Sequence, residues 1–269
     1  MSAAFALVLL AAGALAGCAQ RLVLEGLVLQ VDRPASRLVV SHAAVPGRMP
    51  AMVMPVRTAK ASLLDRVSPG SRVRLRMRGA VADRLSVLRE SLGDLNVPEP
   101  AEAVRIGEVL PDFELVDHQG APFRLSENRG RLVVVQFLYT RCPLPEVCPR
   151  LAASFGSLQR RFQEAIPERL VLVSITLDPS HDTPEELARY ARRIHASYPG
   201  WRFLTGAVEP VARLFGLVHW AEEGLIVHTS QTGLIDREGR LVALVDGSSY
   251  RFEQLRDLVN LHLAREEKP

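Results

Sequence analysis

The stretch Arg131–Pro149, RLVVVQFLYTRCPLPEVCP, passes from an apolar run into a loop that holds two cysteines, Cys142 and Cys148. The run is continuously apolar, which is typical of a strand buried on both faces of a sheet. Cys142 follows it directly, and Cys148 lies at or just inside the next predicted helix, whose spacing covers 151–165. The carboxyl end of such a strand is the usual site position of an open α/β sheet, and a helix N-terminus there favours a thiolate.

Residues 105–269 alternate apolar runs with helical patterns, which predicts an α/β sheet covered on both faces. Asp182 is the expected N-cap of the helix after the second buried strand, and Pro184 lies near its first turn. The predicted segments in chain order are a hairpin turning at 118–120, a strand at 131–140, a helix at 151–165, a strand at 169–178, a helix at 182–198, a strand at 201–206, a helix at 208–216, a hairpin turning at 237–239 and a helix at 251–266.

The N-terminal region has a different character. Short β-type runs are separated there by turn signals such as Asp32–Pro34 and Ser68–Gly70. About five short strands in so few residues suggest a small all-β barrel of the oligonucleotide/oligosaccharide-binding kind. We therefore divide the chain into a signal peptide at 1–17, a barrel at 18–97, a linker at 98–104 and the α/β domain at 105–269.

Composition narrows the possible functions. A chain of 269 residues with 48% hydrophobic residues has material for more than one core, which argues against overall disorder. The net charge is only +3, and the arginines of SRVRLRMRG (71–79) alternate with apolar residues. This alternation indicates that the arginines lie on the solvent-exposed face of a half-buried strand and do not form a basic patch for nucleic acid. We therefore expect no nucleic-acid partner.

The N-terminus, MSAAFALVLLAAGALAGCAQ, is an apolar run of secretory-signal length that ends in small residues. Leu15–Cys18, LAGC, resembles the bacterial lipobox, in which the cysteine is acylated and becomes the first residue of the mature protein. We expect an exported lipoprotein held to the membrane through Cys18, facing the periplasm or the cell exterior. The alternatives are an uncleaved anchor and a start codon placed too far downstream.

Export bears on the two remaining cysteines, because unpaired thiols tend to find partners in an oxidising compartment. If Cys18 carries lipid, Cys142 and Cys148 are the two cysteines of the chain that keep a thiol. A disulfide closing so short a loop would constrain the unfolded chain little. A redox pair or the sulfur half of a metal site is the better interpretation.

Residues from about 105 to 266 resemble the Sco/SenC family through GEVLPDFELVDHQGAPFRLSENRGRLVVVQFLYTRCPLPEVCP, VLVSITLDPSHDTPEELARYA, WRFLTG and VHTSQTGLIDREGRL. The resemblance implies a thioredoxin-like copper chaperone for cytochrome c oxidase, with Cys142, Cys148 and His228 as copper ligands. Thiolates suit Cu(I), and the imidazole lets such a site also hold Cu(II). The family further implies that Asp178 supports the site, although a turn or capping role fits equally well.

The cysteine spacing departs from the family pattern. Five residues separate Cys142 from Cys148, where the family usually has three. The spacing also differs from Cys-x-x-Cys, so a thiol–disulfide oxidoreductase, with Cys142 attacking and Cys148 resolving, is the alternative function. A peroxidase is less supported, because Thr140 stands at the wrong offset. His219 is the histidine most easily confused with the third ligand.

The segment Ser41–Val56, SHAAVPGRMPAMVMPV, joins one histidine to three of the five methionines. It resembles the CusF-type periplasmic copper-binding barrel, which implies ligation by His42, Met52 and Met54, with Met49 in place of the family's tryptophan. Thioether and imidazole donors suit Cu(I). The alternative is that these methionines only fill the core.

Together these patterns predict an exported protein with two copper sites that transfers metal without turnover. Its expected partner is a cytochrome c oxidase subunit or another copper acceptor. Besides the oxidoreductase, a copper buffer or sensor remains open, in which the barrel binds copper and the second domain is a docking scaffold.

Overall fold

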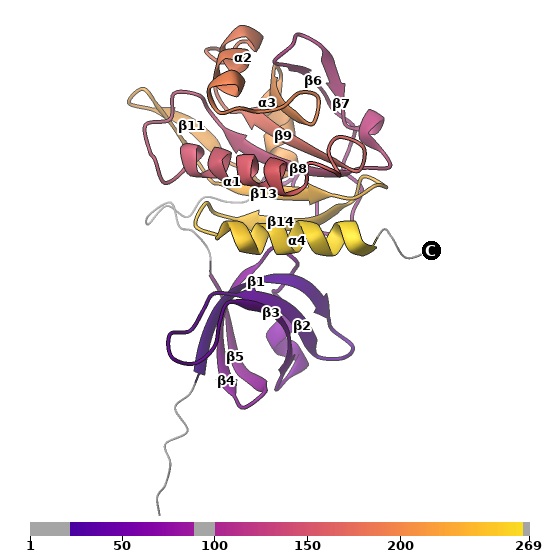
Figure 1. Ribbon diagram of the computed structural model, residues 1–269, viewed down its shortest axis with the longest axis vertical. Helices are drawn as coiled ribbons and strands as arrows, with labels where there is room; N and C mark the ends of the chain where they lie inside the picture. Colours follow the sequence, from indigo (N-terminus) through magenta and orange to yellow (C-terminus); the bar gives the residue numbers. More distant parts are fainter. Residues whose placement is uncertain (1–21, 89–99, 266–269) are drawn as a thin grey trace, which may run out of the picture.

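The computed structural model describes residues 22–88 and 100–265, which form a small barrel and a larger α/β domain (Figure 1). The predicted signal peptide, Cys18 and residues 98–99 at the start of the predicted linker lie outside the described residues. Within those ranges, no helix is both long and apolar enough to cross a membrane.

The N-terminal part is a closed five-stranded barrel of order β1-β2-β3-β5-β4, which confirms the predicted small all-β domain. In β4 the apolar residues are buried while Arg74 and Arg78 are exposed, as the alternating pattern predicts. The elements are β1 (Leu22–Asp32), β2 (Arg37–His42), β3 (Met52–Thr58), the 3-10 helix η1 (Ala61–Leu64), β4 (Arg72–Arg78) and β5 (Val81–Leu88).

The second part is a seven-stranded sheet of order β14-β13-β8-β9-β10-β6-β7, in which β8, β9 and β10 are parallel. A separate two-stranded sheet pairs β11 with β12. The strands are β6 (Glu114–Asp117), β7 (Pro122–Arg124), β8 (Leu132–Leu138), β9 (Leu170–Thr176), β10 (Trp201–Thr205), β11 (His219–Glu222), β12 (Leu225–His228), β13 (Gln231–Ile235) and β14 (Leu241–Asp246). The helices are η2 (Ser126–Asn128), α1 (Cys148–Arg161), α2 (Pro184–Arg193), α3 (Val208–Leu214) and α4 (Phe252–Arg265).

The continuous apolar run of β8 is buried along its whole length. Leu132 and Val134 pack in one core with residues of α1, α2 and α4, whereas Val133 and Val135 pack in a second core with residues of α3. Successive side chains of a strand point to opposite faces, so one strand contributes to both cores. The sheet is therefore covered on both faces, and the predicted thioredoxin-like α/β fold is confirmed.

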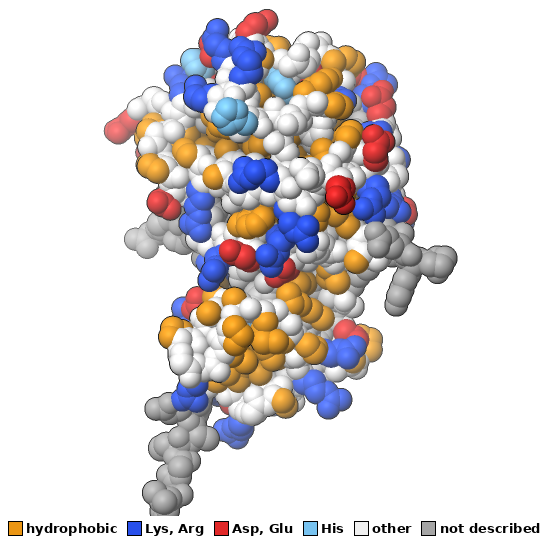
Figure 2. Space-filling model, in the orientation of Figure 1, with side chains coloured by type: hydrophobic (Ala, Val, Ile, Leu, Met, Phe, Trp, Pro, Cys, Tyr) orange, Lys and Arg blue, Asp and Glu red, His pale blue; other side chains and the backbone are white. Residues whose placement is uncertain are grey.

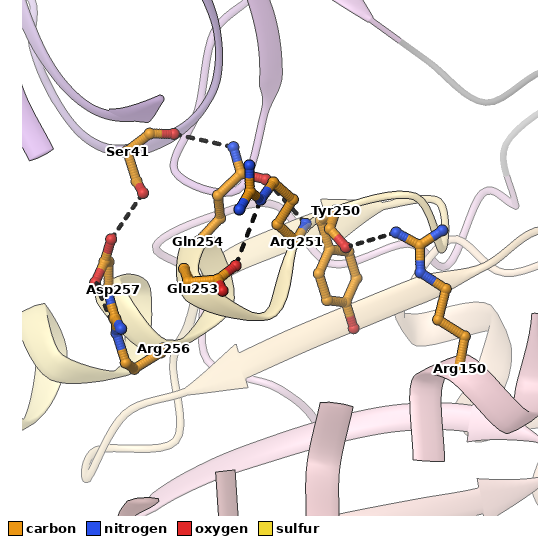
Figure 3. Close-up of polar contacts among 8 residues, drawn as sticks. All are labelled: Ser41, Arg150, Tyr250, Arg251, Glu253, Gln254, Arg256 and Asp257. Carbon is orange, nitrogen blue, oxygen red and sulfur yellow. Dashed lines mark hydrogen bonds and ion pairs between the residues drawn. The ribbon is translucent and has the colours of Figure 1, made fainter. Parts of the chain in front are cut away.

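The barrel contacts the second domain through β1, β2 and α4 (Figure 1). Leu27 and Leu29 of β1 belong to the same apolar core as α1 and α4. The Ser41 hydroxyl donates to Asp257 at 2.7 Å, and the Gln254 amide donates to the Ser41 carbonyl at 3.0 Å (Figure 3). The two domains thus share apolar and polar contacts, and these two hydrogen bonds involve the residue before His42.

One capping prediction is wrong. The N-cap of α2 is Thr183, whose hydroxyl accepts from the Glu186 N–H, and Pro184 opens the helix as predicted. Asp182 is instead fully buried, because its carboxylate accepts hydrogen bonds from Thr140 and Thr176 on two strand ends. These hydrogen bonds offset the cost of burying the carboxylate, and Thr183 caps the helix in its place.

Candidate metal centres

The cysteine loop joins the carboxyl end of β8 to the start of α1. The Cys142 N–H donates to the Tyr139 carbonyl at 3.3 Å, which turns the chain just after the strand. Cys148 is the first residue of α1 and is buried, with Pro149 in the first turn, where a missing N–H costs nothing. Cys142 is half-buried, and both thiols are free.

The two thiols have opposite acidities. The Cys148 thiol donates a hydrogen bond to Cys142 and lowers the Cys142 pKa to about 5, although burial opposes the shift. The Leu144 and Cys148 N–H groups and the Tyr139 hydroxyl add to this effect. The same bond and burial raise the pKa of Cys148. Near neutral pH Cys142 is therefore a thiolate and Cys148 a thiol.

This asymmetry can be titrated. In the reduced protein we expect the ultraviolet thiolate absorbance of Cys142 to persist down to about pH 5, the Cys142 pKa, and to disappear below it. Cys148→Ala removes the strongest hydrogen-bond donor, so the midpoint should move up toward the ordinary thiol value of about 8.5. A wild-type midpoint already near that value would contradict the hydrogen-bonded pair.

His228 shares a cavity with the exposed side of the cysteine pair. Tyr139, Cys142 and His228 line a cavity of about 220 Å³, and the rings of Tyr139 and His228 lie edge to face with centroids 6.1 Å apart. His228 Nδ1 lies 2.9 Å from the Thr229 carbonyl. A carbonyl only accepts hydrogen bonds, so Nδ1 holds the proton and Nε2 presents its lone pair. Burial lowers the His228 pKa, which keeps the ring neutral and fit to bind a metal.

The structure brings the predicted ligands to one region without closing a chelate. Within residues 22–88 and 100–265, no three His, Cys, Asp or Glu side chains are gathered tightly enough to hold a metal ion. His228 ends β12, and His219 stands opposite it across the β11–β12 hairpin, outside the residues that line the cavity. His228 is thus the histidine that faces Cys142.

Two buried acids hold the loop rather than touching the thiols. Asp178 accepts from Arg141 at 2.7 Å and from Ser180 at 3.0 Å, and so fixes the residue before Cys142. Asp182 accepts from the Thr140 N–H at 3.0 Å. This role of Asp182 was not predicted from the sequence, and neither was that of Tyr139, whose position at the end of the buried strand was the available signal.

A second group of candidate ligands lies on β2 and β3 of the barrel. His42 is paired with Met52, and Val40 with Met54, so the imidazole and both thioethers share one face. Met54 and Met49 pack against the barrel core, whereas Met52 is 45% exposed. Figure 2 shows a broad hydrophobic area on the barrel. The donors therefore run from the interior of the barrel to its surface.

His42 has an unused ligand atom. It is 2% exposed, and its Nδ1 lies 2.6 Å from the Ala43 carbonyl, which assigns the proton to Nδ1. Its Nε2 is buried and, among the described residues, has no hydrogen-bond partner. A buried lone pair without a donor is costly, and a soft metal held jointly by thioethers would satisfy it.

The fold and the site define a thioredoxin-like protein with a dithiol, preceded by a small β-barrel. Residues 102–262 match the SCO1/SenC family model, and residues 23–86 match a model described as copper binding periplasmic protein CusF. The first match spans more than half of the chain, so this chain belongs to the SCO1/SenC family and carries an N-terminal CusF-like domain.

Individual relatives agree with this assignment. The mitochondrial SCO2 homolog of Homo sapiens is 30% identical over 212 residues, which cover 73% of this chain and 77% of the relative. The structure of a SCO1/SenC family lipoprotein from Bacillus anthracis is 26% identical, with a TM-score of 0.51. The superposition covers 60% of this chain and 96% of the Bacillus anthracis chain. BsSco, described as a member of the Sco family of cytochrome c oxidase assembly proteins, shares the fold at 21% identity and a TM-score of 0.50, and covers 63% and 98%.

Proposed function

We propose that this protein binds copper outside the cytoplasm and transfers it to an acceptor such as a subunit of cytochrome c oxidase. The observation that carries the proposal is the hydrogen-bonded Cys142–Cys148 pair of free thiols. Cys142 shares a cavity with His228, whose neutral ring presents the Nε2 lone pair to a metal. Thiolates suit Cu(I), and an imidazole extends the site to Cu(II). The copper-binding description of the barrel's family and the oxidase-assembly description of BsSco add support.

The two donor sets differ in what they release on binding. The barrel offers the thioethers of Met49, Met52 and Met54 with the unprotonated Nε2 of His42, none of which must lose a proton. The cysteine site must lose the Cys148 proton, and β12 must bring His228 closer to both sulfurs. Copper bound first by the barrel could therefore pass to the thiolates in a transfer function without turnover.

Copper stoichiometry tests this proposal. The reduced full chain should bind two Cu(I) ions, and alkylating the cysteines should leave one. Cu(II) added to the unmodified chain should give thiolate charge-transfer absorption, which alkylation abolishes. Binding of no copper before or after reduction would overturn the proposal.

A thiol–disulfide oxidoreductase is the second candidate, and the unequal thiols favour it. A half-exposed thiolate at Cys142 and a buried thiol at Cys148 are the arrangement that an attacking and a resolving cysteine need. His228→Ala separates the two functions, because disulfide exchange tolerates loss of the imidazole whereas copper binding does not. If His228→Ala bound copper normally but lost disulfide exchange, His228 would belong to the exchange reaction and not to a copper site.

We further propose that the mature protein is a lipoprotein anchored through Cys18. The Bacillus anthracis relative is described as a lipoprotein, and the LAGC pattern ends at this cysteine. Mass spectrometry of the protein extracted from membranes should find an acylated Cys18 at the N-terminus. An intact segment from Met1 to Gly17 would contradict the anchor.

A further inference from the structure

A second cleft adjoins the cysteine pair and is lined by residues of α1, of α2 and of the cysteine loop rather than of the β11–β12 hairpin. It has a volume of about 450 Å³ and lies between α1 and α2. Cys142 and Cys148 line one end, and Arg160 and Arg193, near the carboxyl ends of these helices, also line it. Of the two cysteines in the described residues, only Cys142 lines both this cleft and the His228 cavity.

The α1 wall of this cleft is built from small side chains. Pro149, Ala152, Ala153, Gly156 and Ser157 recur at helical spacing, so they form one stripe that ends at Arg160. A Cβ at Gly156 would make ordinary van der Waals contacts with Arg160 at 3.6 Å and with Trp201 at 3.9 Å, so crowding does not require the glycine. Small side chains leave room for the backbone of a second chain beside α1.

Among the described residues, the two arginines at the far end have no acidic partner. Arg160 donates to the Ser157 hydroxyl at 2.9 Å, and the Arg193 guanidinium lies over the Tyr190 ring at 5.0 Å. In the described part of the chain neither forms an ion pair with a carboxylate, whereas Arg189 of α2 pairs with Glu186. Two guanidinium groups without a counter-charge at the end of an open cleft are suited to binding carboxylates.

We infer that this cleft binds an extended segment of the partner protein that carries a cysteine and, further along, acidic side chains. The inference rests on the proposed exchange of copper or disulfide with a partner's thiols. Twelve helical steps separate Cys148 from Arg160, a rise of about 18 Å. An extended chain covers about 3.3 Å per residue, so the carboxylates lie about five residues from the cysteine. The arginines thereby place the partner's sulfur on Cys142.

The test uses peptide disulfides with the reduced full chain carrying Cys18→Ser. Two peptides have one cysteine joined to thionitrobenzoate and, five residues away, either a Glu-Glu pair or a Gln-Gln pair. The Cys142 thiolate attacks the peptide sulfur, forming a protein–peptide disulfide and releasing thionitrobenzoate, whose absorbance gives the rate. Cys148 then loses its proton and displaces the peptide thiolate, forming the Cys142–Cys148 disulfide.

At low ionic strength the Glu-Glu peptide should react about tenfold faster than the Gln-Gln peptide, and the difference should vanish at high salt. Arg160→Glu with Arg193→Glu should reverse the preference between the two peptides. The neighbouring Arg161→Glu with Arg192→Glu is the matched control, since both are exposed outside the cleft, and it should keep the preference.

An equal rate for both peptides, or a preference that survives in the Arg160/Arg193 variant, would overturn the inference. So would an arginine-dependent advantage seen only with the thionitrobenzoate disulfide of glutathione, which would assign the cleft to a small anionic thiol. Copper stoichiometry of the same variants separates the two proposals. Normal copper binding without peptide preference refutes the cleft alone, whereas absent copper binding refutes the proposed function.

Discussion

Serine in place of Cys142 or Cys148 is expected to lower the Cu(I) affinity of the C-terminal site by more than about 100-fold. Losing a residue that only supports a metal ligand lowers metal affinity by up to about 100-fold, and losing the ligand itself should cost more. Each substitution removes one of two thiolates from a three-donor set. Neither thiol carries a structural disulfide, so the fold should survive. Titration of the reduced chain with Cu(I) against a competing chelator measures the loss.

His228→Ala should abolish the Cu(II) charge-transfer absorption, because the imidazole is the donor that accommodates Cu(II). His219→Ala is the matched control, since His219 faces His228 across the hairpin but lies outside the cavity with Cys142. It should leave the spectrum unchanged. Undiminished copper binding in all three site variants would refute this ligand set.

The second large effect is expected in the barrel. In a Cys142→Ser/Cys148→Ser background, His42→Ala should lower the remaining Cu(I) affinity by more than about tenfold, because it removes a buried nitrogen that has no hydrogen-bond partner among the described residues and lies on the face shared with Met52 and Met54. Met52→Leu should also weaken binding, since it removes a sulfur while keeping the volume. Met52 is largely exposed, so this change should cost little stability.

Met77→Leu provides the control for the barrel, because Met77 is a buried core residue of β4. It should leave copper affinity unchanged. Isothermal titration with Cu(I) under reducing conditions measures all three variants. A barrel that binds no copper before mutation would assign Met49, Met52 and Met54 to core packing.

The fold was largely predictable because its signals are local. Continuous apolar runs predicted the buried strands β8 and β9. The alternation of arginines with apolar residues predicted β4, in which Arg74 and Arg78 are exposed. The β11–β12 hairpin was not predicted, since its partly exposed strands lack a clear period of two and turn at Glu223 and Gly224, both with positive φ. His228 could accordingly be assigned from the family resemblance but not from its strand.

The docking of the barrel on α4 was also not predicted from the sequence. Leu27, Val28 and Leu29 are consecutive and all buried, because Val28 faces the barrel core while its two neighbours face the other domain. This break in the alternation of β1 was the available signal. Separating the domains would expose Leu27 and Leu29, so copper transfer is better measured between full chains.

The different pKa values of the two thiols determine how copper transfer from the barrel to the cysteine site should depend on pH. Above pH 7 the Cys142 thiolate is already ionised, so copper binding at the cysteine site releases one proton, from Cys148. Its Cu(I) affinity should rise about tenfold per pH unit while the Cys148 thiol remains protonated. The thioethers of the barrel release none.

The most direct test loads Cu(I) on the barrel of a Cys142→Ser/Cys148→Ser chain and mixes it with a reduced His42→Ala/Met52→Leu chain. After separation of the two chains, copper analysis gives the distribution between barrel and cysteine site. Transfer through this protein predicts that copper moves to the cysteine site and that the ratio rises about tenfold between pH 7 and 8. Copper that stays on the barrel at both pH values, or a ratio that falls as pH rises, would contradict it.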